Sequence, residues 1–345
     1  MLSLCALLLP TALALAITPQ ALSSPTSPRE ARLHLPYAWA ETATSSCRSL
    51  PYTRAYHGKH ARFWHPHELD ALESWVQQQW FNTHELAYGD VFHYVLDPAV
   101  RPQANYSVLD VGSNTGWYSA FAAGRGYPVV SIDMLAECAR RSRCGSIANL
   151  ASQLVEIHHA FATDDAGVAA GALRAQGAHC FSGTSAAWRD SWEWPGFTEL
   201  VQPLQLGRLL AARGRRVAIA KIDIEGGEVA VVRSLAQGNA LQLIDHLLVE
   251  FSPHMWAALN ITTTSEGVGA FAPLFAAGFT AVDLPEGYTV HPPSWAACAS
   301  TGPGLEAQGS CRKVVSTVDL ALYAEGVMRA TAVAFRVFTL WFSRL

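Results

Sequence analysis

The chain has 345 residues, of which half are hydrophobic and only 15% are charged, against about 25% charged residues in an average soluble domain. Such a hydrophobic composition excludes an intrinsically disordered chain. A net charge of −4 excludes the strongly basic surface that is typical of nucleic-acid binding. Low charge is also typical of membrane proteins, which makes the hydrophobic runs the first question.

The N-terminal segment 1–23 has the character of a targeting sequence. Residues 2–17 are almost wholly hydrophobic, and the first charged side chain is Arg29. This run is short for a bilayer span, which needs about 20 residues, and Ala14 and Ala16 have the spacing of a signal-peptidase site. We therefore expect either a cleaved signal peptide or a signal anchor, which places the protein in the secretory pathway (the ER or Golgi lumen, or outside the cell).

Residues 24–100 are expected to form an N-terminal extension. Four histidines between His57 and His67 suggest a metal site, but Pro66 breaks any common helix and acidic partners are sparse, so a surface loop is the favoured interpretation. Hydrophobic residues at helical spacing over 67–81 predict an amphipathic helix.

Cysteines and sequons fit the same location. The chain has seven cysteines, and loss of the first with the leader leaves six, an even number that favours disulfide bonds in a secretory protein. Cys298 and Cys311 bracket a loop rich in glycine and proline and are the first candidates for a pair. Asn105 and Asn260 begin N-glycosylation sequons, which are usable only in the secretory pathway.

Over residues 101–325, short β-rich runs alternate with helical stretches. The expected strands are 107–112, 128–133, 154–161, 217–223, 246–251 and 279–284. The expected helices are 116–126, 137–151, 168–177, 228–238 and 268–278, and the run 314–324 closes the series. This alternation predicts a parallel α/β sheet that is buried on both faces. Ligands of such sheets bind beyond the carboxyl ends of the strands.

The last segment, 326–345, is expected to form an amphipathic helix. Arg329 and Arg336 are seven residues apart and share one face, while most of the aromatic side chains lie opposite them. We expect this helix to pack on the domain, with contact to a membrane surface as the alternative.

Polar residues end the first two expected strands. The first strand leads into a loop that contains Asp110, Gly112, Ser113, Asn114 and Gly116. Its glycines permit a sharp turn close to a ligand, but they are four residues apart and differ from the GxGxxG of dinucleotide sites. A carboxylate beside this turn suits a cationic ligand better than a pyrophosphate. Asp133, followed by Met134, ends the second strand, where an acidic residue binds ribose hydroxyls.

The segment VLDVGSNTGWYS, with SID after it, resembles the nucleoside-binding half of class I S-adenosylmethionine-dependent methyltransferases. Further on, AIAKIDIEGGEVAVVRSL followed by HLLVEF is similar to the KIDVEGxE block of the FkbM family of these enzymes. The resemblance covers about residues 105–285. It implies a Rossmann-like, doubly wound, mostly parallel sheet of seven strands with S-adenosylmethionine as cofactor. Two departures are Ser113, where the family usually has alanine, and the missing Asp near Pro203.

The resemblance also assigns roles to residues. It implies that the cofactor is bound by the loop from Asp110 to Gly116, with Asp133 as ribose ligand, and that a second block contains Asp223, Glu225, Gly226 and Glu228. A hydroxyl acceptor needs help to lose its proton. We expect Asp223 to accept that proton or orient the acceptor, supported by Glu225 and by Glu250 at the end of the neighbouring strand. Glu225 as a helix cap, His254 as a rival base and a metal bound by the carboxylates are alternatives, and no metal is the favoured interpretation.

The leading hypothesis is an O-methyltransferase that acts on a hydroxyl of a glycan or small metabolite, with no nucleic-acid partner and membrane contact only through an uncleaved leader. An alternative is a non-catalytic protein of this fold that binds a glycan or protein partner through Trp188, Trp192 and Trp194. A dehydrogenase that binds a nicotinamide dinucleotide is less favoured because of the glycine spacing.

Overall fold

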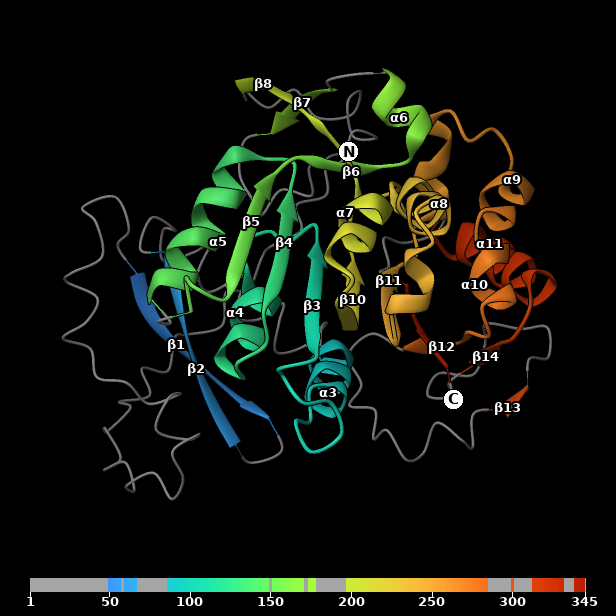
Figure 1. Ribbon diagram of the computed structural model, residues 1–345. Coiled ribbons are helices and arrows are strands. Elements are labelled where there is room, and N and C mark those ends of the chain that lie inside the picture. The colour runs from blue at the N-terminus through green and yellow to red at the C-terminus, as the bar shows by residue number, and fades with distance from the viewer. Residues whose placement is uncertain are drawn as a thin grey trace, which may run out of the picture.

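The computed structural model describes residues 49–56, 59–66, 86–148, 151–170, 173–177, 197–284, 299–300, 312–331 and 338–344. Their centre is a sheet of nine strands in the order β13-β14-β12-β15-β11-β10-β3-β4-β5 (Figure 1). The strands are β3 (Tyr106–Val111), β4 (Val129–Asp133), β5 (Val155–His159), β10 (Arg216–Ile222), β11 (His246–Glu250), β12 (Thr280–Leu284), β13 (Ala299–Ser300), β14 (Arg312–Val314) and β15 (Thr339–Ser343).

The sheet is mostly parallel. Strands β5, β4, β3, β10 and β11 are parallel neighbours, and β15 is antiparallel to both β11 and β12. The predicted parallel α/β arrangement is confirmed, and the six strands expected from the sequence lie at the expected places. The fold is therefore a mixed α/β fold with a mostly parallel central sheet, consistent with a Rossmann-like architecture.

The order of the parallel strands defines where a ligand binds. The chain builds β3, β4 and β5 outward in one direction, then returns to place β10 on the other side of β3 and β11 beyond it. In such open sheets the crevice lies at the carboxyl ends of the two strands between which the order reverses. Here these strands are β3 and β10. Asp110 lies near the carboxyl end of β3, and Asp223 directly follows β10.

Helices cover both faces of the sheet. One face packs against α3 (Leu86–Val95) and α4 (Trp117–Gly124), beside which lies α5 (Ala136–Ala148). The other face packs against α7 (Leu206–Arg213), α8 (Glu228–Gln237), the 3-10 helices η3 (Ala240–Leu243) and η4 (Pro253–Leu259), and α9 (Thr264–Gly269), α10 (Ala272–Ala276) and α11 (Thr317–Thr331). Val108 and Leu109, adjacent in β3, belong to the two different cores. Burial on both faces explains why these strands are hydrophobic without alternation.

Two predicted helices were wrong. The segment 168–177 contains only the end of α6 (Asp165–Ala170), and then forms β7 (Leu173–Gly177), which pairs with β8 (Phe197–Val201). In the segment 326–345, α11 ends at Thr331 and residues 339–343 form β15. Because β15 is inserted between two strands of the sheet, its aromatic side chains Trp341 and Phe342 are buried on opposite faces. A strand inside a covered sheet is buried on both faces, whereas an amphipathic helix is buried on one face only.

Two small sheets complete the described part. Strands β1 (Ser49–Tyr56) and β2 (Lys59–Pro66) form an antiparallel pair where we expected a loop, and β6 (Phe161–Thr163) pairs with β9 (Pro203–Gln205). The predicted leader 1–23, the predicted helix 67–81 and the three tryptophans of the alternative hypothesis lie outside the described residues. Among the residues described, no helix is long and hydrophobic enough to cross a membrane.

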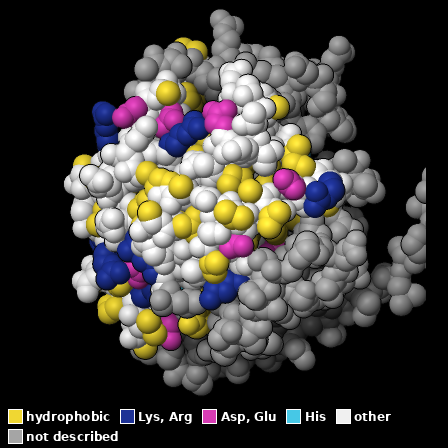
Figure 2. Space-filling model, turned by 90° about the vertical axis from the view of Figure 1, so that its right-hand side faces the viewer, with side chains coloured by type: hydrophobic (Ala, Val, Ile, Leu, Met, Phe, Trp, Pro, Cys, Tyr) yellow, Lys and Arg dark blue, Asp and Glu magenta, His cyan; other side chains and the backbone are white. Residues whose placement is uncertain are grey.

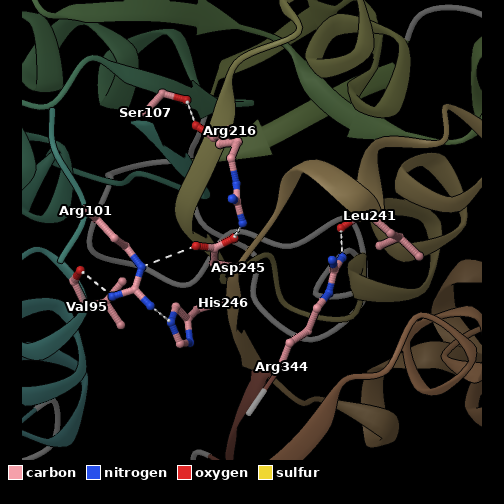
Figure 3. A network of polar contacts seen from close by, with 8 residues as sticks. All are labelled: Val95, Arg101, Ser107, Arg216, Leu241, Asp245, His246 and Arg344. Carbon is pink, nitrogen blue, oxygen red and sulfur yellow. Dashed lines mark hydrogen bonds and ion pairs between the residues drawn. The ribbon is translucent and has the colours of Figure 1, made fainter. Parts of the chain in front are cut away.

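A polar network fastens the amino ends of the strands (Figure 3). Arg101 donates to the carbonyl of Val95 at 3.1 Å and lies 3.4 Å from the carboxylate of Asp245, to which Arg216 also binds. The ring of His246, which contacts Arg101 at 2.6 Å, stacks on Trp341 of β15. Because these contacts lie at the end of the sheet opposite to the predicted crevice, we assign them to stability.

The side of the molecule that carries α9, α10 and α11 shows scattered hydrophobic side chains between polar and charged ones (Figure 2). Val318 and Leu322, one turn apart on α11, are each more than half exposed. Single exposed hydrophobic residues of this kind are normal for a globular surface.

Candidate functional site

A cavity of about 580 Å³ lies at the carboxyl ends of β3, β4 and β10, a size within the usual range for small-molecule sites. Its wall is built from the loop after β3, the end of β4, the segment from β6 to α6, the loop after β10 and one side of α8. The charged residues among those that line it are Asp133, Asp164, Asp223, Glu225 and Arg233. Four carboxylates against one guanidinium give this wall an excess of negative charge.

The loop after β3 has the backbone that its glycines predict. Gly112 has φ of 73° and Gly116 has φ of 81°, and Asn114 between them is also left-handed. A Cβ atom on Gly112 would lie 1.7 Å from the carbonyl oxygen of Asp223, so the loops after β3 and β10 are in direct contact. Only glycine permits both this backbone conformation and this approach. The two sequence blocks therefore meet at one point of the cavity.

Asp133 holds the glycine loop from the neighbouring strand. Its two carboxylate oxygens accept hydrogen bonds from the backbone N–H groups of Asn114, at 2.8 Å, and Leu135, at 2.9 Å. Burial raises the pKa of Asp133 to about 7, although the two backbone hydrogen bonds oppose this shift. Each oxygen has accepted one hydrogen bond here and retains capacity for another, as a ribose ligand requires.

Asp110 lies behind the loop rather than in the cavity. Its side chain is completely buried and accepts a 2.6 Å hydrogen bond from the hydroxyl of Ser119 on α4. Burial raises the pKa of Asp110 above its ordinary value, against the effect of the nearby Lys221 ammonium group. The resemblance placed Asp110 in the cofactor loop, and its contacts assign it to holding that loop on α4 and β10.

The carboxylates after β10 and β11 form a compact cluster. Asp223, Glu225 and Glu250 each offer one carboxylate oxygen within 4.8 Å of the others, as expected from adjacent strand ends. Burial raises the pKa of Glu250 well above its ordinary value, and the charges of Asp223 and Glu225 add to this. Burial acts in the same direction on Asp223, but Lys221 and a hydrogen bond from Glu250 outweigh it and lower the pKa of Asp223. Glu250 is therefore the member of this pair that carries the proton, and Asp223 is the ionised one.

Three carboxylate oxygens at this spacing can also accept a metal ion. Such acidic groups are common without one, and the hydrogen bond between Asp223 and Glu250 already uses part of the donor set. The absence of a metal here stays a prediction.

The other two residues of the second block shape the loop. Gly226 has φ of 100°, and a Cβ atom there would lie 2.9 Å from that of Met255. Glu228 is fully buried and accepts hydrogen bonds from the backbone of Gly226 at 3.0 Å and from the indole of Trp256 at 3.3 Å. Burial raises the pKa of Glu228 to about 7. The carboxylate of Glu228 therefore fixes the turn after β10 from inside the protein.

The structure brings most, but not all, predicted site residues to the cavity. Those that line it are Gly112, Asn114, Asp133, Met134, Asp223 and Glu225. Those that lie behind or beside its described wall are Asp110, Ser113, Gly116, Glu250 and His254. His254 is half-buried, and burial lowers its pKa, so it is a weaker candidate for a base than the carboxylates.

Three polar lining residues were not singled out as ligand contacts from the sequence. Asp164 follows β6 and could have been found by the same rule of acidic strand ends. Arg233 lies on the exposed side of α8, 3.5 Å from Glu266, where no local pattern distinguishes it from a solvated residue. Asn260, considered only as a glycosylation acceptor, lines the cavity from the end of η4.

The fold and the site together define a class: an α/β protein with a negatively charged ligand cavity at the point where the strand order reverses. No protein-family model matches the chain. A search of curated proteins found no significant match either. The function is therefore argued from the site itself.

Proposed function

We propose that the protein is an S-adenosylmethionine-dependent O-methyltransferase of the FkbM type, with the seven strands from β5 to β12 as the core of its fold. The observation that carries the proposal is the cavity at the ends of β3 and β10, with its glycine turn, the carboxylate of Asp133 at the end of β4 and its excess of acidic side chains. The proposed acceptor is a hydroxyl group of a glycan or a small metabolite.

The charge of the cavity supports a cationic ligand. Four of the five charged residues in its described wall are acidic, and a surrounding field of one sign concentrates ligands of the opposite sign. A sulfonium donor carries a positive charge at the reacting centre, whereas a dinucleotide brings two negative phosphates. The same observation disfavours the dehydrogenase alternative.

The residues present fit a nucleoside. Asp133 has free acceptor capacity on both oxygens and faces the cavity beside Met134 and Leu135, whose side chains supply a hydrophobic wall. The glycine turn holds the loop after β3 directly against the loop after β10, because any Cβ at Gly112 would collide with the carbonyl oxygen of Asp223. This arrangement matches ribose on the carboxylate and a flat base on the hydrophobic side.

The carboxyl cluster provides the chemistry for a hydroxyl acceptor. The bound donor supplies a methyl group that is already activated by the positive charge on its sulfur. Asp223, which stays ionised and lines the cavity, orients the acceptor and takes the hydroxyl proton as the new carbon–oxygen bond forms and the carbon–sulfur bond breaks. Glu250, whose pKa is raised by burial and by Asp223, carries its own proton and donates a hydrogen bond to Asp223. Glu225 lines the cavity beside them.

The proposed location is the secretory pathway, which favours a glycan acceptor. Cys138 and Cys144 support it, since both are buried and disulfide-bonded, and disulfides persist in oxidising compartments.

The test is transfer of a labelled methyl group from S-adenosylmethionine to a panel of glycans and polyols by the purified full chain. We expect label in at least one hydroxyl acceptor, strongly reduced by Asp223→Asn and unchanged by Asp165→Asn, an exposed carboxylate outside the reacting cluster. Donor binding without transfer to any acceptor would favour the non-catalytic alternative. The absence of both binding and transfer would refute the proposal.

A further inference from the structure

Lys221 is a buried lysine at the centre of the site. It lies in β10 directly opposite Asp110 of β3, and its side chain is 4% exposed. An ammonium group in such a place is costly unless it is paired and hydrogen-bonded. Its surroundings therefore indicate what it is there to hold.

The ammonium group joins the two loops that build the cavity. It donates to the carboxylate of Asp223 at 2.8 Å and to the carbonyl oxygen of Gly112 at 3.3 Å. It also lies 3.9 Å from the carboxylate of Asp110 and 5.3 Å from the ring centre of Tyr118 on α4. Gly112 and Asp223 both line the cavity, whereas Lys221 itself does not. One positive charge thus stands directly behind the wall, bonded to both of its halves.

Lys221 offsets part of the negative charge of this region. The acidic groups that face it or its partners include Asp110, Asp133, Asp223, Glu225 and Glu250, and Lys221 is paired with Asp110 and Asp223. Loss of its charge would leave Asp223 ionised without a cationic partner, or force it to take up a proton. Either way, the electrostatic field at the wall of the cavity would change.

We propose that Lys221 is a positioning residue of the methyl-transfer site, which ties the glycine turn to Asp223 and sets the balance of charge that the site presents to its ligand. The proposal rests on the proposed function. It implies that Lys221 tunes how strongly the site distinguishes the positively charged sulfonium donor from the product of transfer, whose sulfur is neutral. A site that bound the cationic donor much more tightly than the neutral product would gain donor affinity but would also raise the barrier of the methyl-transfer step.

The experiment measures dissociation constants of S-adenosylmethionine and S-adenosylhomocysteine for the full chain by calorimetry at one pH. The readout is the ratio of the two constants, because these ligands differ at the sulfur by one methyl group and one charge. Lys221→Met removes the cation, and Asp223→Asn removes its partner and leaves the cation in excess. The double variant removes both, so that the wild-type balance of charge returns.

We expect Lys221→Met to shift the ratio in favour of S-adenosylmethionine by about fivefold or more, and Asp223→Asn to shift it in the opposite direction, as a change of one unit charge close to the ligand requires. The double variant should return to within about twofold of the wild type. If Lys221→Met does not fold, the comparison of the double variant with Asp223→Asn still tests the proposal, and equal ratios in these two variants would overturn it.

A purely structural lysine gives a different result. Both affinities would then fall in parallel in Lys221→Met and the ratio would stay at the wild-type value in that variant, which would overturn the inference. Failure of the wild-type protein to bind either ligand refutes the proposed function instead, so the two failures are distinguishable.

Discussion

Replacement of Asp133 by asparagine is the most informative single change at the ribose end of the cavity. The carboxylate of Asp133 accepts backbone hydrogen bonds from Asn114 and Leu135, one on each oxygen. Asparagine keeps the shape and one accepting oxygen, but it directs an NH₂ group at one of these N–H donors. The variant therefore loses the charge that ribose hydroxyls bind and loosens one anchor of the glycine loop.

The size of the effect follows from the hydrogen bonds at stake. A hydrogen bond to a charged group contributes about 1.5–3 kcal/mol, and a buried donor without a partner costs about 1–3 kcal/mol. Because asparagine retains one acceptor and part of the contact, we expect a net loss of about 1–3 kcal/mol in donor binding. This corresponds to a roughly 5- to 150-fold increase in the dissociation constant.

Calorimetry with S-adenosylmethionine on the wild type, Asp133→Asn and Asp165→Asn measures this loss. Asp165 is exposed and paired with Arg208 away from the reacting cluster, so its variant should bind like the wild type. Since burial raises the pKa of Asp133 to about 7 and the ionised form would accept hydrogen bonds from ribose, wild-type affinity should rise as the pH increases through about 7 and level off above it. Unchanged affinity in Asp133→Asn, with the same pH profile, would refute the assignment of the ribose site.

Three further predictions concern stability. Gly112→Ala should prevent folding or donor binding, because the new Cβ would lie 1.7 Å from a carbonyl oxygen. Gly214→Ala has open space around it and should lower the free energy of unfolding by only the roughly 1–2 kcal/mol that a left-handed backbone costs. Equal losses of stability in the two variants, measured by urea unfolding, would contradict this prediction. Trp341→Ala should cost about 3–5 kcal/mol and the half-exposed Leu322→Ala much less, as the buried strand β15 requires; similar small losses would favour a surface helix. Glu228 binds its proton more tightly in the folded state, where its pKa is about 7, than in the unfolded state, where it is 4.5. Its contribution to the free energy of unfolding is therefore greatest below about pH 4.5 and falls by about 3 kcal/mol as the pH rises through 7. If the Glu228→Gln variant shows the same pH dependence of unfolding as the wild type, Glu228 does not cause this fall.

The sequence predicted the parallel core of the fold well, because its strands are buried on both faces and their hydrophobic runs are bounded by glycine or acidic residues. It failed for two segments that were predicted as helices and form strands. In the sequence, Phe335, Phe338, Trp341 and Phe342 are spaced like one side of a helix, but pairing with β11 and β12 makes residues 339–343 a strand. Residues 173–177 likewise form a strand because they pair with β8. Contacts distant in sequence override local periodicity in both cases.

The site was predictable to the level of strand ends but not of side-chain roles. Asp110, Asp133, Asp223 and Glu250 were found because each ends a strand, yet Asp110 turned out to lie behind the loop. Burial and pairing, which only the fold establishes, give Glu250 a raised pKa and Asp223 a lowered one.

The low charge of the chain has the same physical origin. Its charged residues are sparse because the sheet is covered on both sides, and several of those it retains meet around one cavity. Lys221 illustrates the point, since it stands inside a hydrophobic strand as an apparent exception and pairs with the carboxylates of both loops.

The most direct test of the account is calorimetric titration of the purified chain with S-adenosylmethionine and, in parallel, with a nicotinamide dinucleotide. The account predicts saturable binding of S-adenosylmethionine, weakened by Asp133→Asn, and no binding of the dinucleotide. Binding of the dinucleotide alone, or of neither ligand by the folded protein, would contradict the central claim that this cavity is a site for a cationic nucleoside donor.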